Sequence, residues 1–326
     1  MSGWSKHVVI VGIDEAGYGP ILGPLVVSAA AFEVPRVDWH RCLWQSLTQS
    51  VSNGTSTRDG RIAIQDSKKL FHRKHGLARL ERSVLSVFGG ANEPPKDLSG
   101  FLTAVAPDVI PLLKEYAWYS HSDLPLPCAA DAGAIRIAAA RFARDLAAKS
   151  VRQSGMWSEV LPEGHFNRLV GVTQNKASAL FGLVLRLIQR AAAAHPDRDV
   201  LFLIDKQGGR GRYGPLLLRA FEDRQLRILK EEDEESEYEL QGRLTKWRVR
   251  FSQSGESKYL PIALASMLSK YLRELFMERF NAYWRQHAAD LVPTAGYYED
   301  GIRFLKDIEP HARRLGIRRE QLVRER

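Results

Sequence analysis

An apolar run that ends in two acidic residues constrains the fold of this chain most. Residues 8–13 are apolar, which is typical of a buried strand, and Asp14 and Glu15 follow them directly. The loop over residues 16–24 is rich in glycine, which permits close backbone approach, and in proline, which fixes φ. A buried strand that ends in paired carboxylates beside such a loop predicts a functional site. Without the loop, a solvated strand end is the simpler interpretation.

The same pattern recurs later in the chain. Residues 199–204 predict a strand that ends in another acid, Asp205. Hairpin strands come first and strands that alternate with helices come later, which indicates an α/β fold with a mixed sheet. The acidic block from Glu231 to Glu239 is interpreted as a solvated loop. Further strands are predicted over residues 25–32, 225–230 and 246–251, and helices over residues 72–87, 132–151, 175–194 and 258–287.

Proline usage divides the chain into segments. Prolines punctuate the stretch from about residue 89 to residue 164, which also holds an alanine-rich helix. We therefore expect an inserted, mainly helical subdomain over residues 91–164. Residues 1–90 and 165–310 then form one discontinuous domain with a helical C-terminal region, and residues 311–326 form a basic tail.

Charge and composition point to a polyanionic partner. The formal net charge is +9, and clustered lysine and arginine displace counterions from a phosphate backbone, although a merely basic protein is the alternative. The two cysteines, Cys42 and Cys128, belong to no zinc motif or disulfide framework, which fits a reducing cytoplasm. No apolar run approaches the roughly 20 residues of a membrane helix. We expect a cytoplasmic monomer without a membrane partner.

A third acid-bearing segment lies on the long helix predicted over residues 258–287. Ser266, Lys270 and Glu274 recur at intervals of four and share one helix face. If Asp14 and Asp205 end neighbouring strands, this helix could bring Glu274 to the same point. Crowded carboxylates need cations, and two Mg²⁺ or Mn²⁺ ions about 4 Å apart can activate water for phosphodiester cleavage. The alternative for Lys270 and Glu274 is an i,i+4 ion pair on an exposed helix.

Four motifs carry a resemblance to a known family. Residues 12–20, Gly-Ile-Asp-Glu-Ala-Gly-Tyr-Gly-Pro, closely resemble the signature of the type 2 ribonucleases H, which comprise ribonuclease HII and its archaeal and eukaryotic relatives. Residues 66–70 resemble the second motif of that family, and Asp205 with Gly208, Gly209 and Tyr213 resembles the third. Residues 256–274 are similar to the helix motif. Four motifs in the right order are more specific than any one alone.

The resemblance implies a ribonuclease H-like fold with a mixed five-stranded sheet. It also implies metal-dependent hydrolysis of RNA paired with DNA, or of single ribonucleotides in duplex DNA, which leaves a 3′-hydroxyl and a 5′-phosphate. The backbone of Gly17, Tyr18 and Gly19 matches the loop that contacts the 2′-hydroxyl, the group that distinguishes RNA from DNA. The catalytic, metal-binding carboxylates match Asp14, Glu15, Asp205 and Glu274. Positions near phosphates match Lys68, Lys69, Lys258 and Lys270, and the tyrosine that stacks on a sugar is assigned to Tyr297 or Tyr298.

The chain departs from the family at three positions. Tyr18 stands where type 2 enzymes usually carry arginine, and Glu274 and Glu256 stand where they usually carry aspartate. Type 3 ribonucleases H resemble this chain in using glutamate at the position of Glu274. Two alternatives to an active ribonuclease H follow from these departures. One is a nucleic-acid-binding protein of the same fold that has lost turnover, and the other is a structure-specific DNA nuclease.

Overall fold

The computed structural model describes residues 6–56, 59–71, 76–120, 123–207 and 210–325. The strands are β1 (His7–Ala16), β2 (Leu25–Pro35), β3 (Val51–Ser52), β4 (Ile62–Ala63), β5 (Arg152–Leu161), β6 (Val200–Asp205), β7 (Gln225–Glu231), β8 (Glu235–Gln241) and β9 (Lys246–Ser252). The longer helices are α3 (Ala78–Gly89), α4 (Leu98–Val105), α7 (Ala132–Ala148), α8 (Glu163–Thr173), α9 (Lys176–Ala193), α10 (Gly214–Ala220), α12 (Leu260–His287) and α13 (Tyr298–Arg314). The short helices are η1 (Arg36–Asp38), α1 (Leu43–Ser46), α2 (Ser67–Leu70), η2 (Pro107–Val109), α5 (Ile110–Leu113), α6 (Ala117–Ser120), α11 (Gly255–Lys258) and α14 (Arg319–Leu322).

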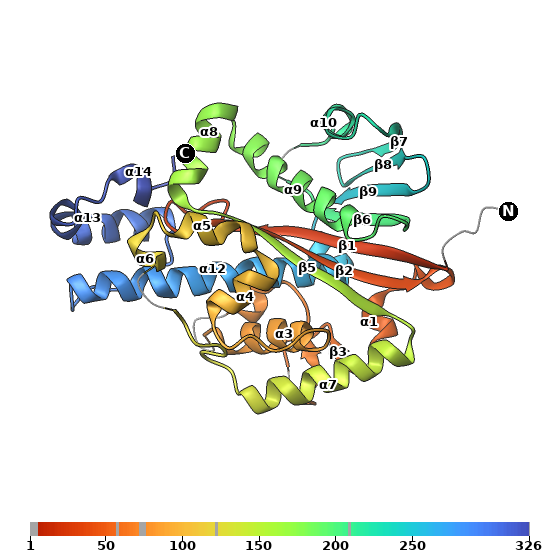
Figure 1. Ribbon diagram of the computed structural model, residues 1–326, viewed down its shortest axis with the longest axis horizontal. Helices are drawn as coiled ribbons and strands as arrows, with labels where there is room; N and C mark the ends of the chain where they lie inside the picture. Colours follow the sequence, from red (N-terminus) through yellow and green to blue (C-terminus); the bar gives the residue numbers. More distant parts are fainter. Residues whose placement is uncertain (1–5, 57–58, 72–75, 121–122, 208–209, 326) are drawn as a thin grey trace.

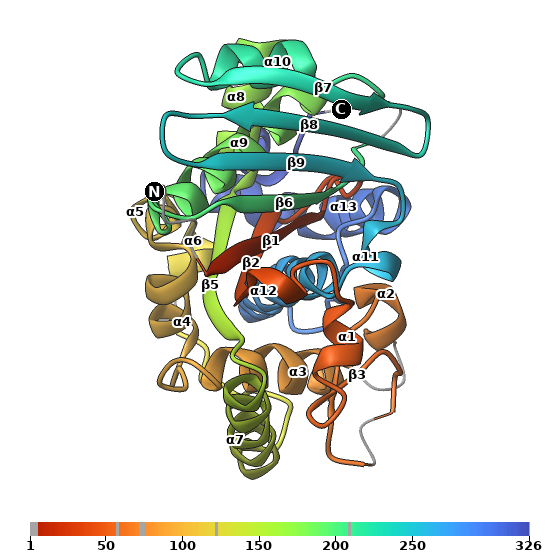
Figure 2. The ribbon, with the colours of Figure 1, turned by 90° about the vertical axis from the view of Figure 1, so that its right-hand side faces the viewer.

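Within the described residues, seven strands form one mixed sheet in the order β5-β2-β1-β6-β9-β8-β7 (Figures 1 and 2). β1 lies antiparallel to β2 and parallel to β6, and β6 lies parallel to β9. The apolar residues of β1 and β6 are buried in a continuous run, as is usual for central strands covered on both faces. The C-terminal ends of β1, β6 and β9 therefore meet at one edge of the sheet.

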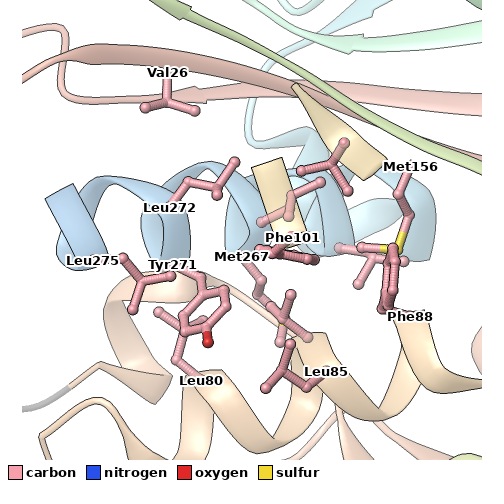
Figure 3. Close-up of a cluster of buried hydrophobic side chains, with 14 of the residues drawn as sticks. Val26, Leu80, Leu85, Phe88, Phe101, Met156, Met267, Tyr271, Leu272 and Leu275 are labelled. Atoms are coloured by element: carbon pink, nitrogen blue, oxygen red, sulfur yellow. The ribbon is translucent and has the colours of Figure 1, made fainter. Parts of the chain in front are cut away.

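Helices cover both faces of this sheet, as Figure 1 shows. α9 packs on one face and α12 on the other, α3 packs against α12, and α4 packs against β5. Figure 3 shows Leu272 of α12 directed toward Val26 of β2, while Tyr271 points toward Leu80 of α3. α12 is thus a core helix, buried on nearly all sides. Across the described chain, no helix is both long and apolar enough to cross a bilayer.

The predicted mixed sheet flanked by helices is confirmed, but the predicted number of five strands is wrong. The two additional strands are β5 and β8. β8 occupies most of the acidic block that was expected to be a solvated loop. Ser236, Tyr238 and Leu240 point into the core, and the acids between them lie on the other face of the strand. Alternation with a period of two, rather than the charge of the run, decides its structure.

Residues 91–164 do not form the separate subdomain expected from their prolines. β5 pairs with β2 from Glu33–Arg152 to Leu25–Leu161, so this segment completes one edge of the main sheet. Trp118 is buried, and its ring centroid lies 5.8 Å from that of Phe280 and 6.5 Å from that of Trp284, both on α12. The segment therefore shares the core of the rest of the chain.

The region expected to be a basic tail, residues 311–326, is also folded where it is described. α13 continues to Arg314, and α14 follows. Leu322 and Arg324 are 3% and 2% exposed. These residues pack on the body of the protein and do not extend into solvent.

Candidate active site

Asp14 and Asp205 lie at the ends of neighbouring parallel strands. β1 and β6 pair with Ile13 opposite Ile204, so the two acids occupy equivalent positions one residue further along. Asp14 is buried and Asp205 is half-buried. Glu15 N–H donates a hydrogen bond of 2.7 Å to Asp14 Oδ1. The structure places the three predicted strand-end acids at one edge of the sheet.

Helix α12 reaches this edge because residue 12 has no side chain. A Cβ on Gly12 would lie 2.0 Å from the carbonyl carbon of Pro261, so glycine alone allows the first turn of α12 to touch β1. From this position Ser269 Oγ donates a hydrogen bond of 3.0 Å to the main-chain oxygen of Asp14. Ser266 lies one turn earlier and lines the same cavity as the acids. The helix therefore forms one wall of the site.

A fourth acid, Glu256, enters the site from α11. The N–H of Gly255 donates a hydrogen bond of 2.7 Å to Asp205 Oδ1 and ties the start of α11 to the end of β6. A Cβ on Gly255 would lie 3.2 Å from that oxygen, which is a tight contact, so glycine favours this close approach. Glu256 is the next residue, and it lines one cavity together with Asp14, Glu15 and Asp205.

These acids raise one another's pKa. Burial and the charge of Glu15 hold the pKa of Asp14 well above its usual range. Burial, helped by the charge of Asp205, raises the pKa of Glu15 to about 7. Burial also raises the pKa of Asp205 to about 7, with the charges of Asp14 and Glu256 contributing. Carboxylates crowded in this way call for protons or a cation to neutralise them.

Glu274 does not join this cluster, and its predicted position there is wrong. It is absent from the cavity wall, and its carboxylate accepts a hydrogen bond of 2.5 Å from Lys270 Nζ. At a rise of about 1.5 Å per residue, Ser266 and Glu274, which are eight positions apart in the sequence, are separated by about 12 Å along the helix axis. A spacing of four keeps residues on one face but does not keep them at one point. The i,i+4 ion pair is what the structure contains.

The cavity has a volume of about 270 Å³ and is lined by both acids and cations. Two residues predicted to contact substrate, Lys69 and Lys258, are exposed and are not among the residues that line it. Tyr297 lines it and is 55% exposed, so its ring is accessible. Besides these four acids, the lining consists of a fifth acid, Asp66, and of Ala16, Gly17, Tyr18, Gly19, Pro20, Ser67, Lys68, Ser266, Lys270, Arg273 and Tyr297.

Arg273 holds the glycine-rich loop in place through hydrogen bonds to its main chain. Its buried guanidinium donates hydrogen bonds of 3.0 Å to Leu22 O and 2.8 Å to Pro24 O. Gly17 has a φ of +89°, and a Cβ there would lie 2.9 Å from Arg273 Cδ, so both conformation and space require glycine. Tyr18 is 41% exposed and lines the cavity.

Sequence reasoning missed the role of Glu256, although a signal was present. Glu256 closely follows the predicted strand over residues 246–251, just as Asp205 ends its own strand. It was treated only as a departure from a family motif. Gly208 and Gly209, which belong to the third motif, lie outside the described residues.

The four acids line one cavity, but they do not surround a single point as the ligands of a bound metal ion would. In the part of the chain that the structure describes, no three histidine, cysteine, aspartate or glutamate side chains form a ready-made metal site. The chemistry of the donors nevertheless fits a hard divalent cation. All four donors are carboxylates, and the raised pKa values of Asp14, Glu15 and Asp205 reflect negative charges that lack sufficient compensation.

No protein-family model matches this chain, and no curated protein matches it. Among solved structures, it is similar to RNase HII from Archaeoglobus fulgidus in its PCNA complex, with 14% identity, a TM-score of 0.42, and coverage of 98% of this chain and 95% of that chain. It is similar to Bst-RNase HIII in complex with Mn²⁺, with 14% identity, a TM-score of 0.46, and coverage of 97% and 66%. It is also similar to ribonuclease H2 from Pyrococcus horikoshii OT3, with 13% identity, a TM-score of 0.42, and coverage of 96% and 92%.

Proposed function

We propose that this protein is a metal-dependent endonuclease of the type 2 ribonuclease H kind. It acts as a monomer on the RNA strand of RNA/DNA hybrids or at ribonucleotides embedded in duplex DNA, and its products carry a 3′-hydroxyl and a 5′-phosphate. One observation carries the proposal, together with the motif resemblance. Five acids line one cavity beside a glycine-rich loop and two lysines. Four of them come from β1, β6 and α11, namely Asp14, Glu15, Asp205 and Glu256, and the fifth, Asp66, caps α2.

The acids are difficult to explain as structural groups. Burial and mutual repulsion raise the pKa of three of them, so without a bound cation they oppose folding at neutral pH. A protein that only bound nucleic acid would gain nothing from negative charge in its binding cavity, because phosphates are repelled by it. Perturbed carboxylates gathered in a cavity are typical of a catalytic centre.

Each acid has a defined role in this proposal. Asp14, Glu15, Asp205 and Glu256 hold Mg²⁺ or Mn²⁺, cations that prefer oxygen ligands. When bound, such a cation activates water and stabilises the leaving oxygen in phosphodiester hydrolysis. Ser269 fixes the main chain of Asp14, and the N–H of Gly255 fixes the orientation of the Asp205 carboxylate.

The cations and the loop bind the substrate. Lys68 and Lys270 line the cavity and offer ammonium groups to the phosphates that flank the scissile bond. The backbone of Gly17 and Gly19 approaches the sugar closely because neither residue carries a side chain, and it contacts the 2′-hydroxyl. The exposed ring of Tyr18 replaces the arginine usual in the family, so an aromatic contact replaces one charged phosphate contact.

The test uses labelled duplexes that contain one ribonucleotide, an RNA/DNA hybrid, or DNA only, incubated with Mg²⁺ or Mn²⁺. We expect cleavage of the ribonucleotide-containing duplexes, products with a 3′-hydroxyl and a 5′-phosphate, and no cleavage in EDTA. Binding is measured in parallel by fluorescence anisotropy. Binding without cleavage of any ribonucleotide-containing duplex would reject the proposal in favour of a binding protein, and cleavage of the DNA-only duplex would favour a DNA nuclease.

A further inference from the structure

Two buried charged residues from distant segments hold the back of the glycine-rich loop. Arg324, which follows α14, donates from its main-chain N–H to Ile21 O over 2.8 Å and from Nη2 to Pro20 O. Glu163, the first residue of α8, accepts a hydrogen bond of 3.1 Å from the N–H of Gly23. We refer to Arg324 and Glu163 together as the support pair. Neither residue is among those that line the cavity.

The loop therefore has two different sides: its front lines the cavity, and its back is held by hydrogen bonds to buried residues. At the front, Gly17, Tyr18, Gly19 and Pro20 line the cavity. At the back, the support pair and Arg273 bind main-chain groups from Pro20 to Pro24, and the carbonyl of Gly296 accepts hydrogen bonds from the N–H groups of Ile21 and Leu22. Pro20 belongs to both sides, so a displacement at the back is transmitted directly to the front.

Stability alone does not account for the support pair. Arg324 is 2% exposed, and its Nε and Nη1 have no hydrogen-bond partner among the described residues. Burial, together with the charge of Arg273, lowers its pKa to about 9. Glu163 is fully buried, and burial raises its pKa to about 7. Buried charges with incomplete pairing are often no more stable than apolar residues of similar volume.

We infer that Arg324 and Glu163 are positioning residues for the glycine-rich loop. They fix the main chain of residues 20–23 and thereby set how strongly the cavity distinguishes a ribonucleotide from a deoxyribonucleotide. The second part of this inference rests on the proposed function, because it takes the loop as the element that contacts the 2′-hydroxyl. The first part concerns the loop alone and is testable without any activity.

The experiment compares four variants of the full chain with the wild type. Arg324→Met removes the guanidinium but keeps similar volume, and Arg324→Lys keeps a donor for Pro20 O. Glu163→Gln keeps the acceptor for Gly23. Arg319→Met is the matched control, because Arg319 is exposed on α14 close to Arg324. Three quantities are measured: the melting temperature, the amide hydrogen exchange of residues 17–19 and 21–23, and the kcat and KM on the single-ribonucleotide and DNA-only duplexes.

For Arg324→Met we expect a melting temperature equal to or above that of the wild type, together with at least fivefold faster exchange of the loop amides. We expect kcat on the single-ribonucleotide duplex to fall about tenfold with KM within about twofold, because misplacement affects the reacting geometry more than binding. Arg324→Lys should recover part of both losses. Glu163→Gln and Arg319→Met should behave like the wild type in exchange and in kcat.

Unchanged loop exchange in Arg324→Met would overturn the inference, as would a loss of activity that only follows a lower melting temperature. Faster exchange with unchanged kcat and unchanged discrimination would overturn the specificity role. If the wild type cleaves no duplex, the proposed function fails and the specificity role fails with it. The exchange data then still decide whether the support pair positions the loop.

Discussion

Two sets of acids in the same sheet have opposite surroundings. On β8, Glu237 and Glu239 face the cations of β9, with Glu237 Oε1 3.1 Å from Arg250 Nη2 and Glu239 Oε2 3.2 Å from Lys246 Nζ. In the cavity at the ends of β1 and β6, the charged neighbours that most affect the pKa values of Asp14 and Asp205 are further acids. The charged neighbours, and not residue type or position in a strand, distinguish acids held in ion pairs from the crowded acids of the candidate site.

The largest effect is expected when one acid is removed from the cavity. Asp14→Asn keeps the size and a hydrogen-bonding oxygen but removes a charged metal ligand. We expect cleavage of the single-ribonucleotide duplex to fall about 10³-fold or more, because groups that act as one catalytic unit show losses of this size. Duplex binding, measured by anisotropy, should stay within about twofold. Full activity in Asp14→Asn would show that the metal site is wrongly assigned.

The next largest effect distinguishes the two candidates for the fourth acid. Glu256→Gln should reduce kcat by about 10²-fold, because Glu256 lines the cavity with the other acids. Glu274→Gln should change kcat by about fivefold or less, because Glu274 contacts Lys270 and lies away from the cavity wall. Parallel steady-state kinetics on one duplex measure both. The reverse order of effects would restore Glu274 to the site.

A smaller effect concerns stability without metal. Folding raises the pKa of Asp205 from 3.8 to about 7, so between these values the folded protein holds a proton that the unfolded chain has released. The free energy of unfolding therefore falls as the pH rises through this window. In EDTA at pH 8, Asp205→Asn should raise it by about 1–2 kcal/mol, a value reduced for partial solvent exposure. Urea unfolding at pH 4 and pH 8 measures this, and an equal gain at both values would contradict it.

The smallest effect is expected on β8. Glu237→Gln removes one charge from a row of ion pairs near the surface, so it should lower the free energy of unfolding by about 0.5–1 kcal/mol, and less in high salt. Cleavage should be unaffected. A stabilising effect, like that expected for Asp205→Asn, would erase the distinction between the two sets of acids.

The sequence was sufficient to predict the part of the site that depends on strand ends. Val8 to Ile13 and Val200 to Ile204 are apolar runs followed by acids, and parallel pairing brings such ends together. The position of Glu274 was mispredicted because a helical interval reports direction around the axis and not distance along it. The contribution of Glu256 depends on a turn at Gly255, and the hydrophobic periodicity of the sequence does not predict this turn.

The strands that were missed have local reasons. β8 carries an acid at every second position, and a charge run conceals an alternation of buried residues that is visible at Ser236, Tyr238 and Leu240. β5 begins with the polar residues Arg152, Gln153 and Ser154, and it lies at the edge of the sheet, where polar side chains are tolerated. Neither pattern resembles a continuous apolar strand.

The contact between Gly12 and the first turn of α12 has an implication for natural sequence change. A single methyl group at position 12 would occupy space already filled by the backbone of Pro261. The helix would have to retreat by more than an ångström, and Ser266 and Ser269 would move away from Asp14 with it. A descendant of this protein could therefore keep all four acids and still lose the proposed activity through a residue that contributes no reacting group.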